Sequence, residues 1–272
     1  MTHTRVRCTL YSLLLVSLAV PGAGQGPGQN QPDSSAPSTP VTVAPLIKLE
    51  ERPVSAKLLV PNILQDQKRI WLFPVGLARG EHLKPALGFA LGTAGLVALD
   101  PHDTPYFRRT TTFNDFNRVM SSRNTGLSMW LFPPVFYALG MARKDQHAKD
   151  TALLGVQALA NAQLLTLALK SVNRRVRPRE LPPDGDFTHT WFKAGGRVIS
   201  YQSSFPSGHS MMAFSLATVF TYRYRRHRWV PWVAYALASA VAFSRVTTRS
   251  HYPSDIFAGA VLGYAMTRYI VL

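Results

Sequence analysis

The sequence predicts an all-α protein, a helical bundle of about six core helices. Six apolar stretches occur between residue 85 and the C-terminus, and none alternates apolar and polar residues as a half-buried strand does. Most are rich in alanine and leucine, and their small residues allow helices to pack closely. The stretches cover residues 85–99, 127–142, 151–169, 210–222, 229–244 and 256–272.

Residues 1–24 are expected to be a signal peptide or an N-terminal anchor. Arg5 and Arg7 precede an apolar segment of about 11 residues, which suits a secretory signal and is short for a membrane span. Small residues follow, so we expect cleavage near Gly24, with an uncleaved anchor as the alternative. Cys8 precedes the apolar segment and is the only cysteine of the chain, which excludes an intramolecular disulfide.

Residues 25–55 are rich in glycine, proline, glutamine and serine and contain few large apolar residues. Such a segment cannot bury enough surface to offset the entropy that ordering would cost. We therefore expect a disordered tether here, followed by a helical domain over residues 56–272.

The net charge of +16 indicates an anionic partner, such as nucleic acid, a lipid headgroup surface or a phosphorylated substrate. The chain has no zinc-finger spacing and no recognisable nucleic-acid-binding signature, so we expect no nucleic-acid partner. The few acidic residues are scattered, and this argues against a metal site built from several carboxylates.

The apolar stretches leave two arrangements open. Most are shorter than the roughly 20 residues needed to cross a membrane, although several are apolar all round. The positive-inside rule would place the basic loops 142–149 and 223–228 in the cytoplasm, whereas an export signal would place residue 84 outside. Either one early stretch does not span, or the body is an exported bundle. We expect membrane contact.

Chemistry concentrates in three motifs, of which the first is KSVNRRVRP. Lys170 and Arg177 are seven residues apart and would share a helix face if the helix continued that far. Pro178 bars the helix from running on. The alternative is a basic helix end that complements the helix dipole.

The second motif is PSGHS, which opens an apolar helix. Ser207 and Gly208 lie where free backbone N–H groups of the helix N-terminus form an anion site, and His209 lies within reach of the bound anion. The alternative is a serine N-cap with a histidine in the first turn.

The third motif is SRVTTRSHYPSD. Arg245 ends an apolar helix, His251 precedes the next helix, and Asp255 falls in that helix's first turn. A carboxylate there can fix the tautomer of the imidazole and leave its other nitrogen free as a nucleophile. The alternative is an acidic N-terminal helix residue beside a loop histidine.

Three cations, a backbone anion site and two histidines suit metal-free phosphoryl transfer, in which positioning and charge stabilisation dominate. The order and spacing of the motifs resemble the signatures of the type 2 phosphatidic acid phosphatase and vanadium haloperoxidase superfamily, in its phosphatase branch. The match runs from about residue 150 to 265, and every signature position is filled.

The resemblance implies a helical bundle with the phosphate site at one end and a phosphatase that needs no metal or cofactor. The substrate would be a phosphomonoester or pyrophosphate, expected to be lipid-linked, such as phosphatidate or an isoprenoid pyrophosphate. Carried over by position, the roles are phosphate binding for Lys170, Arg177, Ser207, Gly208 and Arg245, phosphohistidine formation for His251, orientation of His251 for Asp255 and proton donation for His209.

The resemblance also implies a cell-envelope location, exported, with the active site on the outer side of the inner membrane. Two other functions stay open: a vanadate-dependent haloperoxidase, and a catalytically silent envelope protein that binds lipid.

Several residues lie outside this pattern. Arg249 would bind a second phosphate or a nearby carboxylate, and Trp191 and Phe192 would contact a lipid tail, cap the pocket or pack on the surface. Arg118 and Arg123 are either extra anion contacts or solvated loop charges. Residues 60–126 receive no chemical assignment.

Overall fold

A computed structural model describes residues 52–182, 184–196, 199 and 201–272. The expected signal peptide or anchor and nearly all of the expected tether lie outside the described residues. The first helical turn is the 3-10 segment Ala56–Leu58.

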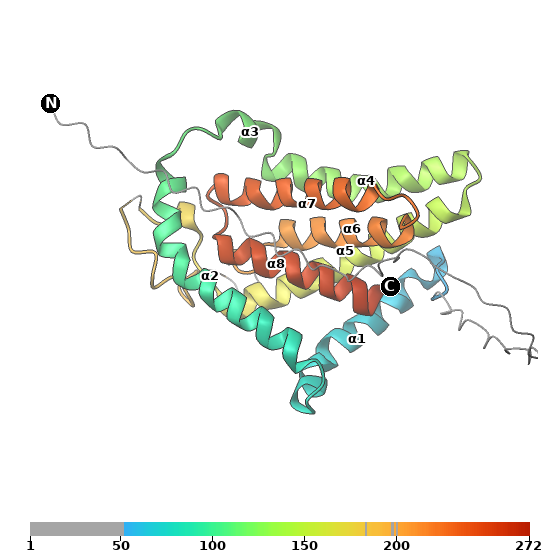
Figure 1. Cartoon of the computed structure of the whole chain (residues 1–272), viewed down its shortest axis with the longest axis horizontal. Helices are drawn as coiled ribbons and strands as arrows, with labels where there is room; N and C mark the ends of the chain where they lie inside the picture. The colour runs from blue at the N-terminus through green and yellow to red at the C-terminus, as the bar shows by residue number, and fades with distance from the viewer. Residues whose placement is uncertain (1–51, 183, 197–198, 200) are drawn as a thin grey trace, which may run out of the picture. The chain divides into compact units, whose positions relative to one another are not determined.

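The prediction of an all-α fold is confirmed, because the described residues form helices and connections without a strand (Figure 1). The helices are α1 (Leu59–Ala78), α2 (Leu83–Arg109), α3 (Asn114–Val119), α4 (Ser122–Ala142), α5 (Gln146–Asn173), α6 (Gly208–Arg223), α7 (Val230–Thr247) and α8 (Pro253–Met266). Each of the six predicted apolar stretches lies on one of these, the last continuing into the π-helical turn Thr267–Val271. Helices α1 and α3 fall within the region that the sequence left unassigned.

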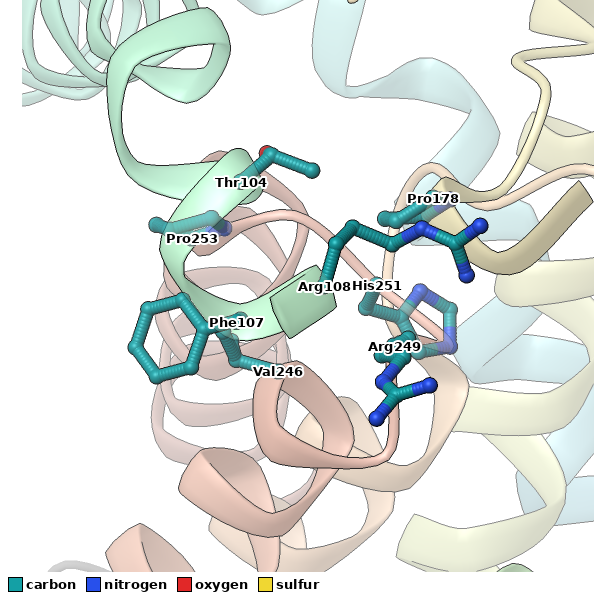
Figure 2. A pocket seen from close by; sticks show the side chains of 8 residues that line it. All are labelled: Thr104, Phe107, Arg108, Pro178, Val246, Arg249, His251 and Pro253. Carbon is teal, nitrogen blue, oxygen red and sulfur yellow. The ribbon is translucent and has the colours of Figure 1, made fainter. Parts of the chain in front are cut away.

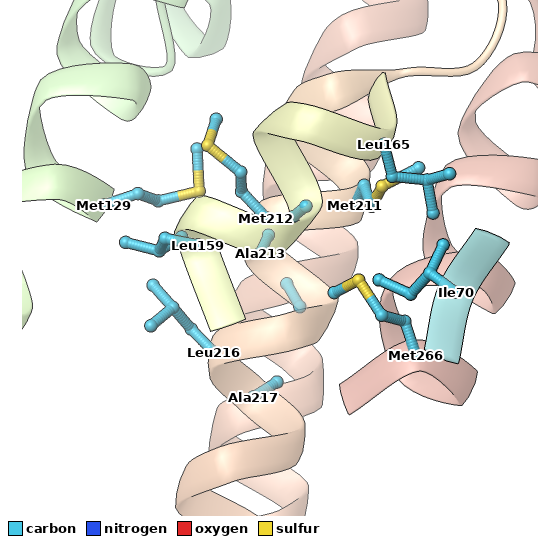
Figure 3. Packing of buried hydrophobic residues seen from close by; sticks show 12 residues of the cluster. Ile70, Met129, Leu159, Leu165, Met211, Met212, Ala213, Leu216, Ala217 and Met266 are labelled. Atoms are coloured by element: carbon cyan, nitrogen blue, oxygen red, sulfur yellow. The ribbon is translucent and has the colours of Figure 1, made fainter. Parts of the chain in front are cut away.

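Helix α6 is the centre of the bundle and packs against α5, α7 and α8. It is apolar on most sides, so it buries Met211 and Leu216 together with smaller side chains (Figure 3). Two glycines bring α8 against it. A Cβ atom added at Gly259 would clash with the Ser207 carbonyl oxygen, and one at Gly263 would clash with the Met211 carbonyl oxygen. This contact places the start of α8 beside the start of α6.

Helix α1 is held to α5 by a buried carboxylate. Asp66 is fully buried and forms an ion pair with Arg52. Its other oxygen accepts from Gln157 Nε2 at 2.5 Å and from Asn161 Nδ2 at 2.8 Å. Both oxygens of this buried carboxylate therefore have a donor, as buried charges require.

Three helices are long and apolar enough to cross a membrane by length and composition: α2, α5 and α7. The apolar window of α2 is almost entirely exposed on the protein, and that of α5 is about half buried. Exposed apolar side chains on α2 and α4 include Leu91 and Phe132. Such extensive exposed apolar faces indicate association with a membrane.

Candidate active site

The three motifs meet at one end of the bundle, where α5 and α7 end and α6 and α8 begin (Figure 1). The backbone N–H of Ser207 donates to the carbonyl oxygen of Asp255 at 2.9 Å. The N–H of His251 donates to the carbonyl oxygen of Arg245 at 3.1 Å. Backbone contacts therefore join the second motif to the third and close the turn between α7 and α8.

Ser207 is the N-cap of α6, and its hydroxyl oxygen accepts from the Ser210 N–H at 3.3 Å. Because its side chain is fully buried and its own N–H is used by Asp255, Ser207 has little left to offer a ligand. The N–H groups of Gly208 and His209 have no acceptor among the described residues. These two groups, at the positive end of the helix dipole, are the better candidates for binding an anion.

The helix does not continue to Arg177, the condition under which Lys170 and Arg177 would share a helix face, since α5 ends at Asn173 and Arg174 turns left-handed with φ 45°. Carbonyl oxygens of the α5–α6 connection hold both cations. Lys170 is buried and its Nζ donates to Ser203. Arg177 Nη2 donates to the Tyr201 carbonyl oxygen at 2.7 Å.

Arg245 is fully buried at the end of α7. Its Nη1 donates to the Ser122 hydroxyl at 2.5 Å and its Nη2 to the Met120 carbonyl oxygen, so it also holds the start of α4. His209 Nε2 lies 3.0 Å from the carbonyl oxygen of Ser122. Burial, followed by repulsion from Arg245, lowers the pKa of His209 to about 4. The ring is therefore neutral at pH 7 when no anion is bound.

His251 and Asp255 face each other as the sequence predicts. Nδ1 of His251 lies 3.5 Å from Oδ2 of Asp255, an ion-pair distance, and makes no hydrogen bond to the described residues. Both side chains are almost completely buried. Burial lowers the pKa of His251 to about 3, although the nearby Asp255 carboxylate acts in the opposite direction. The imidazole is thus neutral at pH 7, with Nε2 as its second nitrogen.

Two site residues escaped the sequence analysis. Arg175, only 1% exposed, donates to Asp255 Oδ1 at 2.7 Å and to Asp100 Oδ2 at 2.6 Å. Arg175 is one of four arginines between residues 174 and 179, and nothing in that run distinguishes it. Asp100 did carry a signal: it directly follows an apolar stretch, and a carboxylate is rarely buried unless it is paired.

A small pocket opens beside His251, and Figure 2 shows Arg108 and Arg249 among the side chains that line it. Arg249 adopts a left-handed conformation with φ 60°. Its guanidinium reaches the Thr110 carbonyl oxygen at 3.5 Å and pairs with no carboxylate of the described residues. Of the two partners expected for Arg249, the carboxylate is therefore absent from this part of the structure.

The remaining predicted residues separate into surface and interior. Arg118 forms an exposed ion pair with Asp115, at 2.9 Å. Phe192 is 73% exposed. Trp191 instead packs edge-on against Phe205 and lies over the Arg175 guanidinium, 4.6 Å from the centre of the indole. Trp191 is thus part of the wall around Arg175.

The model of the PAP2 superfamily matches residues 151–272, which contain every site residue expected from the resemblance. This part of the chain is similar to the PAP2 superfamily. The resemblance inferred from the three motifs is therefore confirmed at the level of the superfamily.

Relatives of known name align with shorter parts of the chain. A lipid A 1-phosphatase of Porphyromonas gingivalis is 39% identical over 62 residues, 22% of this chain and 14% of the relative. A lipid A 1-phosphatase of Rhizobium etli is 34% identical over 100 residues, which are 37% of this chain and 40% of the relative. The bacitracin transport permease protein BcrC of Bacillus licheniformis is 36% identical over 69 residues, which are 25% of this chain and 32% of the relative. The chain thus spans less than half the length of these relatives.

A solved structure is also similar. It is a transmembrane PAP2-type phosphatidylglycerolphosphate phosphatase from Bacillus subtilis, 22% identical, with a TM-score of 0.47. The similarity covers 68% of this chain and 92% of that one.

Proposed function

We propose that this protein is a metal-independent phosphatase that hydrolyses a lipid-linked phosphomonoester or pyrophosphate through a phosphohistidine on His251. The observation that carries the proposal is the His251–Asp255 pair: a neutral, buried imidazole whose Nδ1 faces a carboxylate. A carboxylate in that position keeps the proton on Nδ1 and leaves the Nε2 lone pair free to attack phosphorus.

In the first step, the Nε2–P bond forms and the bond between phosphorus and the leaving oxygen breaks. Lys170, Arg177 and Arg245 stabilise the negative charge on the phosphoryl oxygens, together with the N–H groups of Gly208 and His209. The leaving oxygen takes a proton from His209.

In the second step, water attacks phosphorus from the side that the leaving group vacated. His209 takes a proton from the water, the N–P bond breaks, and inorganic phosphate leaves with His251 neutral again.

Two observations support a lipid substrate. Apolar faces of α2 and α4 are exposed in the bundle, as expected of a protein that meets its substrate in a membrane. Two of the curated relatives are named as lipid A 1-phosphatases, over the limited lengths given above.

The basic loops support an orientation with the site outside. His147, in the basic segment 142–149, contacts the carbonyl oxygen of Arg223, in the basic segment 223–228. Both basic segments therefore lie at one end of the bundle. Helix α6 runs from the site to that end over 16 residues, about 24 Å. If the basic end faces the cytoplasm, the site faces the outer side.

The function is tested on the purified full chain, with EDTA present, by phosphate release from phosphatidate, an isoprenoid pyrophosphate and a soluble phosphomonoester. His251→Ala is expected to abolish release and the acid-labile phosphoryl label that quenched wild-type enzyme carries. The matched control is His189→Ala, an exposed histidine of the α5–α6 connection. Full turnover by His251→Ala, or release only after a divalent cation is added, contradicts the mechanism.

The orientation is tested by single cysteines in a Cys8→Ser background, labelled in spheroplasts with a membrane-impermeant maleimide. Phe192→Cys, exposed at the site end, is expected to react, and Arg226→Cys, in the basic loop, to react only after lysis. The reverse pattern would rule out an outward-facing site.

A further inference from the structure

Arg175 links two buried carboxylates from distant parts of the chain. Its guanidinium lies 2.6 Å from Asp100 on α2 and 2.7 Å from Asp255 on α8. Both aspartates are fully buried, and Arg175 itself follows the end of α5. Three segments that are far apart in sequence therefore meet through one ion cluster directly behind the His251–Asp255 pair.

The guanidinium of Arg175 is fixed on every side. Its Nε donates to the Thr190 hydroxyl at 3.1 Å, and its Nη1 donates to the Ser254 hydroxyl at 2.8 Å as well as to Asp255. Its flat faces are covered by Trp191 and by Tyr252, whose ring centre lies 3.9 Å away. With its donors engaged and its faces covered, the group has no room to rotate.

Arg175 also determines which partners the two oxygens of the Asp255 carboxylate contact. Oδ1 accepts from Arg175, while Oδ2 accepts from the Tyr252 N–H at 2.8 Å and faces Nδ1 of His251. A rotation of the carboxylate would break the contact with Arg175 and turn Oδ2 away from the imidazole. Burial, the largest single effect, raises the pKa of Asp255, but Arg175, His251 and the Tyr252 N–H together lower it below its ordinary value.

Asp100 completes the arrangement. Oδ2 contacts Arg175, and Oδ1 accepts from the backbone N–H of Ser254 at 3.1 Å, so Asp100 also fixes the first turn of α8. Two carboxylates with one guanidinium leave one net negative charge beside His251. Without Asp100, the positive charge of Arg175 would be balanced by Asp255 alone, and Asp255 would have less negative charge to present to the imidazole.

We propose that Arg175 and Asp100 are positioning residues. They orient the Asp255 carboxylate toward His251 and preserve the negative charge that it presents to the imidazole. The proposal rests on the phosphatase function proposed above. When Nε2 of His251 bonds to phosphorus, the imidazole becomes positively charged, and a correctly oriented anionic Asp255 stabilises it. A buried ion cluster adds little stability compared with apolar packing, so this arrangement calls for a role beyond holding the helices together.

The test compares Asp100→Asn and Arg175→Lys with a matched control, Asp66→Asn. Asp66 is an equally buried aspartate paired with an arginine, and it lies on α1 and packs against α5 instead of touching α8. We expect the two site variants to lose kcat by about 10- to 100-fold, the range seen when a group supporting a functional side chain is removed. KM should stay nearly constant. Asp66→Asn should lower the melting temperature and leave kcat of the folded protein unchanged.

A second readout does not depend on turnover. Nitrogen-15 NMR of histidine-labelled protein, with His251 identified by its loss in His251→Gln, is expected to show a proton on Nδ1 in wild type and a mixed tautomer in Asp100→Asn. If wild type releases no phosphate from any substrate, the proposed function fails while this measurement still tests the positioning.

If Asp100→Asn does not fold, Thr190→Val provides the test, because it removes the hydroxyl that accepts from Arg175 Nε. We expect kcat to fall severalfold. Site variants that lose only thermal stability, as Asp66→Asn does, or that keep wild-type kcat and tautomer, would overturn the proposal.

Discussion

The backbone N–H of Ser207 donates to the carbonyl oxygen of Asp255 at 2.9 Å, so the first turn of α6 and the first turn of α8 form one unit. The helix that offers free N–H groups is thereby fixed against the helix that carries the Asp255 carboxylate. The two glycines of α8 make this contact sterically possible. The catalytic geometry consequently depends on residues that touch no substrate.

Gly259→Ala is expected to disturb the site through this contact. Its Cβ would clash with the Ser207 carbonyl oxygen, and overpacking of this kind costs about 1–3 kcal/mol of unfolding free energy. We expect a lower melting temperature and a lower kcat. Gly88→Ala on α2, where an added Cβ meets no atom within 4 Å, is the control. It should leave kcat unchanged and should not lower the melting temperature, because alanine suits a helix interior better than glycine. Wild-type activity in Gly259→Ala would show that catalysis does not depend on the α6–α8 contact.

The pKa of His209 predicts how activity depends on pH. A general acid acts in its protonated form, and the pKa of His209 lies at about 4 in the empty site. We expect kcat/KM, which reports the free enzyme, to fall as pH rises above that value. A bound phosphate dianion raises the pKa, so the corresponding fall of kcat should lie at higher pH. The falls of kcat/KM and of kcat with rising pH should both be absent in His209→Gln. If the two falls occur at the same pH in wild type, the assignment of His209 as the general acid is refuted.

The pKa of His251 predicts how stability depends on pH. It falls to about 3 in the folded protein from an ordinary value of 6.5, so the unfolded chain binds the proton more tightly. His251 therefore opposes folding increasingly as pH drops from about 6.5 toward 3, and it has no such effect above that window. His251→Gln should flatten the melting temperature between these limits relative to wild type.

Arg249 combines a left-handed backbone with a side chain beside His251, and a pair of variants separates these two properties. Arg249→Gly and Arg249→Ala both remove the guanidinium, and only glycine relieves the backbone, by about 1–2 kcal/mol. We expect the glycine variant to melt at the higher temperature. KM should rise equally in both, because both lose the same cation. Unequal KM values would show that the backbone conformation at residue 249, and not only the lost cation, changes KM.

The sequence predicted the fold class because helices depend on local apolar patterns, and the convergence of the three motifs on one site was implied by the family resemblance. Apolar composition marked six helices, and the spacing around Ser207 marked the start of α6. The helix break before Arg177 was not predicted, because Arg174 adopts a left-handed conformation that its residue type does not favour. Asp100 and Arg175 are 75 residues apart, and only tertiary packing determines which of several arginines that carboxylate meets.

The glycine contacts on α8 also bear on motion. At Gly259 and Gly263 the backbone of α8 lies against the backbone of α6, with no side chains between them to compress or change rotamer. Interfaces of this kind resist sliding and shear. The two helices that carry His209 and Asp255 should therefore move as a single rigid body during turnover.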